Sequence, residues 1–139
     1  MFLRYAFLAD TVSLDQAKKV NAIGIFDNIF ATNFPAAHRD MALIAKFEGT
    51  NTDKGDHKIS VELRDDDDNK IVPSLDQNVV LGNAPITQGA TSGGLVMRFQ
   101  DLVFPKPGQY QFVLFGDDRF LGRVLFTVVK ANVRGVGEP

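Results

Sequence analysis

Five consecutive oxygen-bearing side chains, Asp65 to Asn69, are the residues whose types and spacing could do chemistry in this chain. Hard cations such as calcium take several oxygen ligands, often from one short loop. Asp65, Asp67 and Asn69 occupy the first, third and fifth places of a calcium-binding loop, and Asp76 occupies the twelfth. The spacing therefore predicts a calcium site on Asp65, Asp67 and Asn69, in a chain for which we expect no other cofactor.

The rest of the calcium-loop pattern is missing. Lys70 stands where the pattern needs a glycine for its sharp turn, and Pro73 interrupts the residues that follow. Asp53 and Asp56, from a neighbouring polar stretch, could supply further ligands. The competing interpretation, which we favour, is a solvated turn whose Asp and Asn side chains satisfy the backbone geometry.

The two histidines, His38 and His57, are the only candidates for an imidazole base. Nucleophilic catalysis requires such a base beside a serine and a carboxylate in space. Both histidines stand at the start of an expected strand, which is typical of exposed residues. Asp117 and Asp118 are typical of a hairpin turn, and acid–base chemistry would need a second partner across a cleft. We therefore expect a non-enzymatic protein, with a small hydrolase or lyase as a further alternative.

The stretch Gly82 to Gly94 is rich in Gly, Asn, Thr and Ser and is longer than the ~4–6 residues of a typical connection. It lacks the Gly-Lys-Ser/Thr ending and the following helix of a phosphate-binding loop, which excludes that class of nucleotide site. Two interpretations stay open. The stretch is either an ordinary strand connection or a loop that contacts a partner or a second copy of the chain.

The composition excludes several classes of function. The 139 residues contain no cysteine, which excludes disulfides, thiol catalysis and iron–sulfur clusters. The net charge is −2 and the basic residues do not cluster, which argues against nucleic-acid binding. No apolar run approaches the ~18 residues of a membrane span, and Met1 to Asp10 has the pattern of a strand rather than of a signal peptide. We expect a cytoplasmic protein with no nucleic-acid partner and no membrane partner.

Strands must position these residues, because apolar and polar side chains alternate along most of the chain. Val20 to Phe30 is predicted to form one central strand in which Gly24 marks either a bulge or a site of close packing. The polar stretch Ser13 to Lys19 is either a short helical turn or a hairpin connection. We expect no helix beyond that turn and about eight strands, with 70–72 as a short pairing segment; the others lie within 3–10, 20–30, 41–47, 59–63, 77–81, 95–99, 110–114 and 120–128.

The closing hairpin, between Phe99 and Val129, carries the clearest fold signal. In immunoglobulin-like sandwiches a tyrosine two residues before an inward strand position folds its hydroxyl back onto the preceding loop. Gly108-x-Tyr110-x-Phe112 resembles that pattern, with Phe112 in place of the second cysteine of antibody domains. Together with the strand count, it predicts an all-β fold, an antiparallel immunoglobulin-like β-sandwich of about eight strands.

A second resemblance extends over nearly the whole chain. The residues that carry it are Ala6-Phe7-Leu8-Ala9-Asp10, Asn21-Ala22-Ile23-Gly24-Ile25-Phe26-Asp27, Phe34-Pro35, Val61-Glu62-Leu63-Arg64-Asp65 and the Pro-Gly-x-Tyr hairpin. In this order they resemble an uncharacterised bacterial family of small single-domain proteins of unknown function. The resemblance implies a β-sandwich and names no activity, because its motifs are structural.

One domain over residues 1–130, followed by a frayed tail at 131–139, is the organisation that this length predicts. The sequence contains no motif that identifies its function. The interpretation we favour is a non-enzymatic protein-binding or assembly module, in which loops or an edge strand contact another protein or form a homo-oligomer. The alternative is a calcium- or small-ligand-responsive module that uses the acidic loop.

Overall fold

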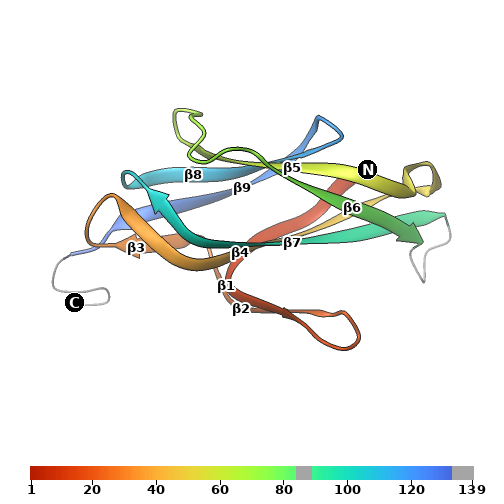
Figure 1. Ribbon diagram of the computed structural model, residues 1–139, viewed down its shortest axis with the longest axis horizontal. Helices are drawn as coiled ribbons and strands as arrows, with labels where there is room; N and C mark the ends of the chain where they lie inside the picture. Colours follow the sequence, from red (N-terminus) through yellow and green to blue (C-terminus); the bar gives the residue numbers. More distant parts are fainter. Residues whose placement is uncertain (84–88, 133–139) are drawn as a thin grey trace.

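Strands make up nearly all of the described chain. In this computed structural model, residues 1–83 and 89–132 are described, and they form nine strands and one 3-10 turn (Figure 1). The bounds are β1 Phe2–Leu14, β2 Val20–Phe26, β3 Asn28–Ala31, β4 Ala36–Thr50, η1 Asn51–Asp53, β5 Gly55–Asp65, β6 Leu75–Asn83, β7 Ala90–Phe104, β8 Gly108–Gly116 and β9 Arg119–Lys130.

The strands form where apolar and polar side chains alternate, because one face of each strand packs on the core. Along β5, Ile59, Val61 and Leu63 are buried, whereas the intervening Ser60 and Glu62 are only half-buried. Neighbouring strands pair in the order β2-β1-β4-β7-β6-β5-β8-β9-β3. All these pairs are antiparallel except β3–β9, which is parallel.

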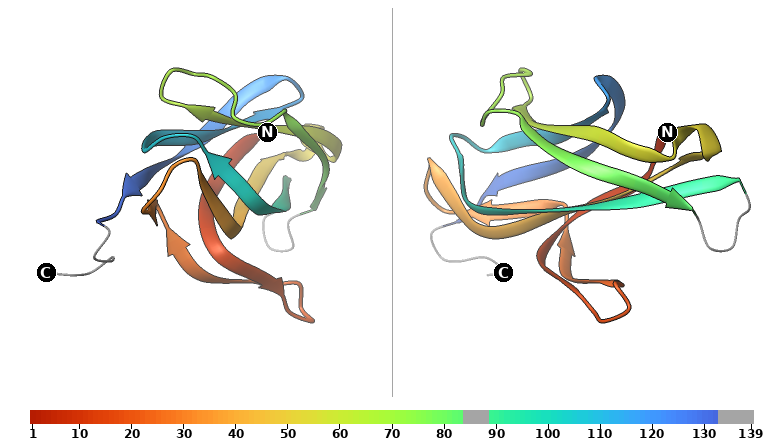
Figure 2. Two further views of the ribbon diagram at one scale, coloured as in Figure 1. Left: turned by 60° about the vertical axis from the view of Figure 1, so that its left-hand side comes forward. Right: turned by 45° about the vertical axis from the view of Figure 1, so that its right-hand side comes forward.

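This single sheet folds back on itself into two layers (Figures 1 and 2). One layer contains β1, β4 and β7, and the other contains β5, β8 and β9. Strand β6 crosses from one to the other, because its start pairs with β5 and its end pairs with β7 through Gly82–Ser92 and Asn83–Thr91. The two layers therefore share hydrogen bonds as well as a core.

The two end strands of the sheet, β2 and β3, are consecutive in sequence. Only Asp27 separates them, yet β2 pairs with β1 and β3 pairs with β9. The chain thus steps from one end of the sheet to the other in one residue, and the Asp27 carbonyl accepts a hydrogen bond from Thr127 N at 2.9 Å. This step nearly closes the sheet, leaving a seam between β1 and β9.

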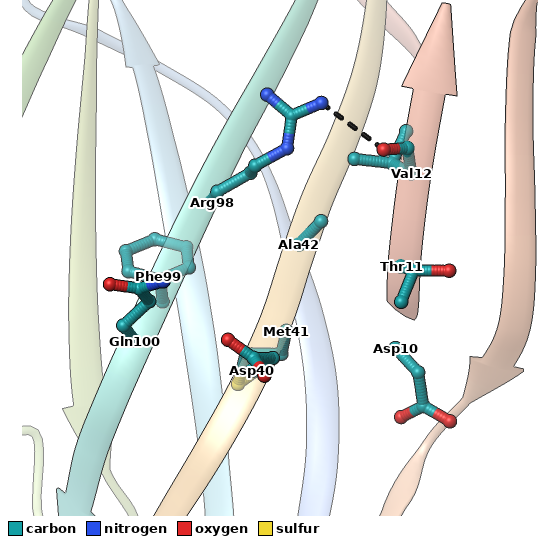
Figure 3. Close-up of a pocket in the computed structure, with 9 residues that line it drawn as sticks. All are labelled: Asp10, Thr11, Val12, Asp40, Met41, Ala42, Arg98, Phe99 and Gln100. Carbon is teal, nitrogen blue, oxygen red and sulfur yellow. Dashed lines mark hydrogen bonds between the residues drawn. The ribbon is translucent and has the colours of Figure 1, made fainter.

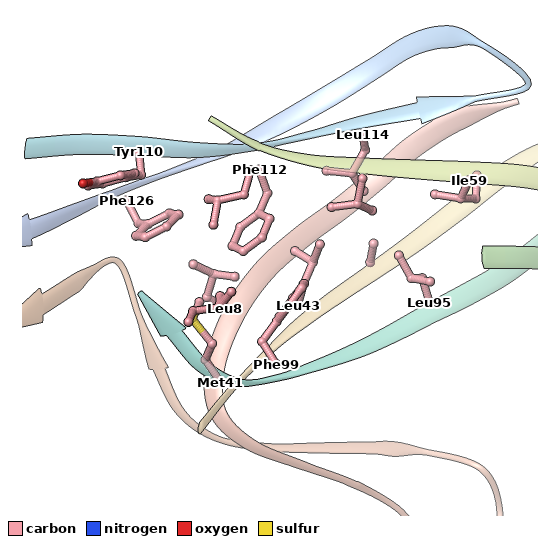
Figure 4. Packing of buried hydrophobic residues seen from close by; sticks show 14 of the residues in the cluster. Leu8, Met41, Leu43, Ile59, Leu95, Phe99, Tyr110, Phe112, Leu114 and Phe126 are labelled. Carbon is pink, nitrogen blue, oxygen red and sulfur yellow. The ribbon is translucent and has the colours of Figure 1, made fainter. Parts of the chain in front are cut away.

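Aromatic rings fill the space between the layers (Figure 4). Phe112 stacks on Phe126 with ring centroids 5.5 Å apart and on Phe99 at 5.2 Å, so rings from β7, β8 and β9 meet. Tyr110 lies 5.9 Å from Phe126 and 5.0 Å from Phe104. The high phenylalanine content thus supplies a core that has no disulfide.

The tyrosine corner predicted from Gly108-x-Tyr110 is confirmed. The Tyr110 hydroxyl donates to the Lys106 carbonyl at 2.6 Å, four residues upstream, while the ring is buried. Burial raises the pKa of Tyr110. The loop after β7 is therefore fastened to β8 by a contact that forms within five residues.

The all-β class is confirmed, but other expectations of the fold differ from the structure. There are nine strands rather than about eight, and they follow one continuous order rather than the two separate sheets of an immunoglobulin-like sandwich. Val20 to Phe30 is not a central strand, because Asp27 divides it into two edge strands. The pattern of alternation was right, but it does not encode which strands lie on either side.

The structure also decides between the two interpretations of Ser13 to Lys19, and it places 70–72 and Ala131. Ser13 and Leu14 end β1, and Asp15 to Lys19 is a hairpin connection, since Lys18 has φ +61° and its amide donates to Asp15 O at 2.9 Å. The segment 70–72 contributes only a single bridge, Arg64–Lys70. Ala131, the first residue of the expected tail, donates its amide to Ala31 O at 2.7 Å, and residues 133–139 lie outside the described chain.

Candidate functional site

The acidic loop is a tight turn at the end of β5, closed around one carboxylate. Asp65 is only 7% exposed, and its Oδ1 accepts hydrogen bonds from the amides of Asp67 and Asn69, both at 2.9 Å. The Asn69 side-chain amide donates to the other oxygen at 3.4 Å. These bonds, led by the one from the Asn69 backbone, lower the pKa of Asp65. The Asp65 side chain thus satisfies backbone amides of its own turn, as aspartate side chains commonly do in turns.

Three carboxylates of the acidic loop come together, two of them, Asp65 and Asp67, from the predicted calcium site, but a lysine lies beside them. Oxygens of Asp65, Asp66 and Asp67 lie within 4.8 Å of one another. Lys106 Nζ, from the loop before β8, lies 3.5 Å from Asp67 and 3.7 Å from Asp66. Asn69 turns its amide nitrogen, not its oxygen, toward Asp65. In this arrangement Lys106 supplies the positive charge that a cation would bring.

The second pair of acidic residues lies far from this loop. Asp56 and Asp65 stand at the two ends of β5, which has 11 residues. At about 3.3 Å per residue, roughly 30 Å separates them. Asp53 lies three residues before Asp56, in η1. A calcium site that combines Asp53 and Asp56 with the acidic loop is therefore wrong, because the two groups lie at opposite ends of β5.

His57 joins three segments at the opposite end of β5. Its Nδ1 lies 2.6 Å from Asp117 Oδ2, in the β8–β9 turn, and its Nε2 lies 2.5 Å from the Asp53 carbonyl. Both partners are acceptors, so both contacts are hydrogen bonds only when both ring nitrogens carry a proton, which is the imidazolium form. The Asp117 hydrogen bond, followed by the Asp53 carbonyl, raises the pKa of His57.

This arrangement holds loops together and leaves no ring nitrogen free to act as a base. His57 is 14% exposed, rather than open at a strand end as expected. His38 does not join it: His38 pairs with Leu102 near the far end of β7, whereas His57 pairs with Val79 on β6. Asp117 and Asp118 form the expected two-residue turn, with φ of +48° and +68°.

The described ends of the Gly82 to Gly94 stretch belong to strands. Gly82 and Asn83 end β6, and Ala90 to Gly94 begin β7, while residues 84–88 lie outside the described chain. The small residues permit a close crossing: a Cβ on Gly93 would lie 2.6 Å from Val80 O. The small residues that indicated a loop also allow β6 and β7 to approach each other closely.

The free edge of β2 is a feature that sequence reasoning placed inside the sheet. In the described chain β2 is hydrogen-bonded to β1 alone. Ile23 and Ile25 are 69% and 64% exposed, more than any other large apolar side chain of the described residues. From Val20 to Phe26 the strand carries no charge and no proline.

The family comparison gives this chain a class but no activity. A family model for a family of unknown function, DUF6941, matches residues 4–129. The chain belongs to the DUF6941 family. This confirms the expected membership in an uncharacterised family; a bacterial source stays a prediction. No curated protein matches the DUF6941 chain.

Two grooves lie on the surface of this DUF6941 member. One, of about 260 Å³, lies where β1 leaves β4, and there Arg98 Nη2 donates to Val12 O at 3.1 Å, with Asp10 and Asp40 at its other end (Figure 3). The other, of about 330 Å³, lies at the seam and is lined by β1, β2 and β9. Neither groove contains a histidine, so neither offers an imidazole base.

No helix in residues 1–83 and 89–132 of the DUF6941 chain is long and apolar enough to cross a membrane.

Proposed function

We propose that this chain is a non-enzymatic protein-binding or assembly module whose contact surface is the exposed edge strand β2. The observation that carries the proposal is the combination of a free backbone edge with Ile23 and Ile25, both about two-thirds exposed, on an uncharged strand. A single domain over residues 1–130 would present this strand on the β1–β2 hairpin, which extends away from the two layers (Figures 1 and 2).

The physical reason is that a free edge is a template for another strand. Its unpaired N–H and C=O groups can hydrogen-bond to any extended chain, and soluble proteins normally protect such edges with lysine, proline or very short strands. The other edge strand, β3, fits that rule because it has only four residues. Strand β2 has seven residues and contains neither lysine nor proline.

The remaining site geometry supports a binding role over an enzymatic one. Both nitrogens of His57 are engaged with acceptors, and His38 lies on a different strand pair. No catalytic residue is proposed.

Light scattering after size-exclusion chromatography tests the proposal. We expect the wild-type mass to rise above that of one chain as concentration increases, and the Ile23→Lys/Ile25→Lys variant to stay at the mass of one chain. The control variant Val80→Lys/Val103→Lys puts the same charges on exposed apolar residues of β6 and β7 and should associate like the wild type. A wild type that stays monomeric at high concentration contradicts the proposal.

A calcium-responsive module remains the second candidate, because three carboxylates lie within 4.8 Å of one another at the end of β5. A cation bound only by the folded state must raise the melting temperature. This candidate predicts a higher melting temperature in calcium than in chelator, and a larger rise in Lys106→Gln, which removes the competing charge. Identical curves for both proteins would discard it.

A further inference from the structure

Charges flank β2 and are absent from it. Lys18 and Lys19 precede the strand and Asp27 follows it directly, and all three side chains are exposed. Among the described residues, none of these three takes part in an ion pair within the chain. The edge thus runs from an end with two lysines and one aspartate, Asp15, which is net positive, to a negative end at Asp27, with uncharged side chains in between.

A strand with this charge pattern is complementary to itself when two copies run in opposite directions. An antiparallel neighbour brings its negative end to the positive end of the first strand, and its positive end to the negative end. A parallel neighbour would place lysine against lysine and aspartate against aspartate, which is unfavourable. The pattern therefore favours a second copy of this chain over an unrelated partner, and it fixes the direction.

We infer that β2 pairs antiparallel with β2 of a second copy, about a two-fold axis at Ile23. This inference rests on the proposed function and names its partner. Pairing Lys19 with Asp27 of the second copy sets the register, and Ile23 then faces its own symmetry mate. The same two-fold axis repeats each contact, as in other isologous dimers.

The register also sets the other cross-strand neighbours, of which only Asn21 and Ile25 pair a polar with an apolar side chain. Val20 faces Phe26, so the ends of the strand gain apolar contact. Ala22 faces Gly24, the only residue of β2 with a left-handed backbone, φ +72°, so the two smallest side chains meet where the strand is least regular. The unpaired backbone groups of both edges then bond to each other, and the β2-to-β3 sheets of two chains become one continuous sheet.

Single cysteines test the register directly, because the chain contains no cysteine of its own. Across the two-fold axis, the two copies of residue 23 would have Cα atoms ~4.5–5.5 Å apart, within the range that a disulfide spans. Ile25→Cys is the matched control: it has the same residue type and similar exposure, yet the two copies of residue 25 would be offset by four residues, or roughly 13 Å.

With oxidised glutathione as oxidant, we expect Ile23→Cys to form a covalent dimer at least ~10-fold faster than Ile25→Cys. Single charge reversals, Lys19→Asp or Asp27→Lys, should weaken dimerisation about three- to tenfold, and the double reversal should restore it. Dimers in light scattering that show no preference for position 23 would overturn this inference and leave the proposed function standing. Monomers throughout would remove both.

Discussion

The Tyr110 hydroxyl belongs to a core side chain and has a hydrogen-bond acceptor of its own. It donates to the Lys106 carbonyl at 2.6 Å from a ring that is nearly fully buried. Tyr110→Phe keeps the ring and removes only this bond, so we expect a loss of about 0.5–1.5 kcal/mol in the free energy of unfolding, measured by urea denaturation. Tyr5→Phe is the control, since Tyr5 is exposed on β1, and it should change that free energy little. Equal losses in both variants would contradict the role of the corner.

His57 makes stability depend on pH, with a definite sign. Its pKa is raised chiefly by the hydrogen bond to Asp117. Its unfolded pKa is ~6.5, so the stabilisation is fully present below that pH and is lost as the pH rises through the higher folded value. We expect the difference in unfolding free energy between wild type and His57→Gln to be largest near pH 5.5–6.5 and to shrink toward pH 9, measured by urea denaturation.

Asp117 sets the lower limit of this pH window. Its pKa is lowered, first by the hydrogen bond from His57, so its contribution is present above ~3.9 and is lost as the pH falls through the folded value. Asp117→Asn should remove most of the His57-dependent pH effect. A difference between wild type and His57→Gln that stays constant or grows toward pH 9 would rule out the imidazolium described above.

These two residues differ in how well sequence could reveal them. The Tyr110 corner spans five residues, so a local motif predicted it. The His57–Asp117 contact joins residues 60 apart, and neither carries a local signal of the other. For Asp65 the side chain alone suggested a cation ligand, because the donors that its oxygen accepts from, the backbone amides of Asp67 and Asn69, are not visible in a list of side chains.

At the scale of elements, Gly93 is the residue of β7 at which the backbone of β6 approaches closely. A Cβ at this position would lie 2.6 Å from Val80 O, which is backbone and cannot move aside. We expect Gly93→Ala to lower the free energy of unfolding by about 1–3 kcal/mol. Its neighbour gives the control: a Cβ on Gly94 would lie 3.7 Å from Ala45 O, an ordinary contact, so Gly94→Ala should be neutral within ~0.5 kcal/mol or stabilising. Thermal or urea denaturation of both variants separates the outcomes, and equal effects would count against the crossing.

Strand existence was predictable because alternation is a local property, as along Ile59, Val61 and Leu63 of β5. Strand position was not. Val20 to Phe30 is as apolar as a central strand. It nevertheless forms the two end strands of the sheet, because the chain leaves β1 at Asp27 and pairs with β9 from Asn28 onward. The apolar exposure of Ile23 and Ile25 therefore became visible only when their neighbours were known.

At the scale of the whole molecule, two connections tie the layers together. Strand β6 is hydrogen-bonded to both layers, and the single residue Asp27 links the two end strands. The seam beside that link is filled in part by side-chain packing, since a Cβ on Gly122 of β9 would meet Leu3 of β1 at 2.7 Å. Neither layer can leave without exposing the aromatic core that both share. The two layers should therefore unfold together, as one cooperative unit.

The two tyrosines can test this cooperativity, because one lies in each layer and the chain has no tryptophan. Tyr5 belongs to β1 and Tyr110 to β8. In Tyr5→Phe the fluorescence reports only the β5–β8–β9 layer, and in Tyr110→Phe only the β1–β4–β7 layer. For each variant we expect the fluorescence and far-ultraviolet circular dichroism transitions in urea to share one midpoint. A layer whose tyrosine changes at lower urea than the circular dichroism signal would unfold separately. In that case β6 and Asp27 would be hinges rather than ties.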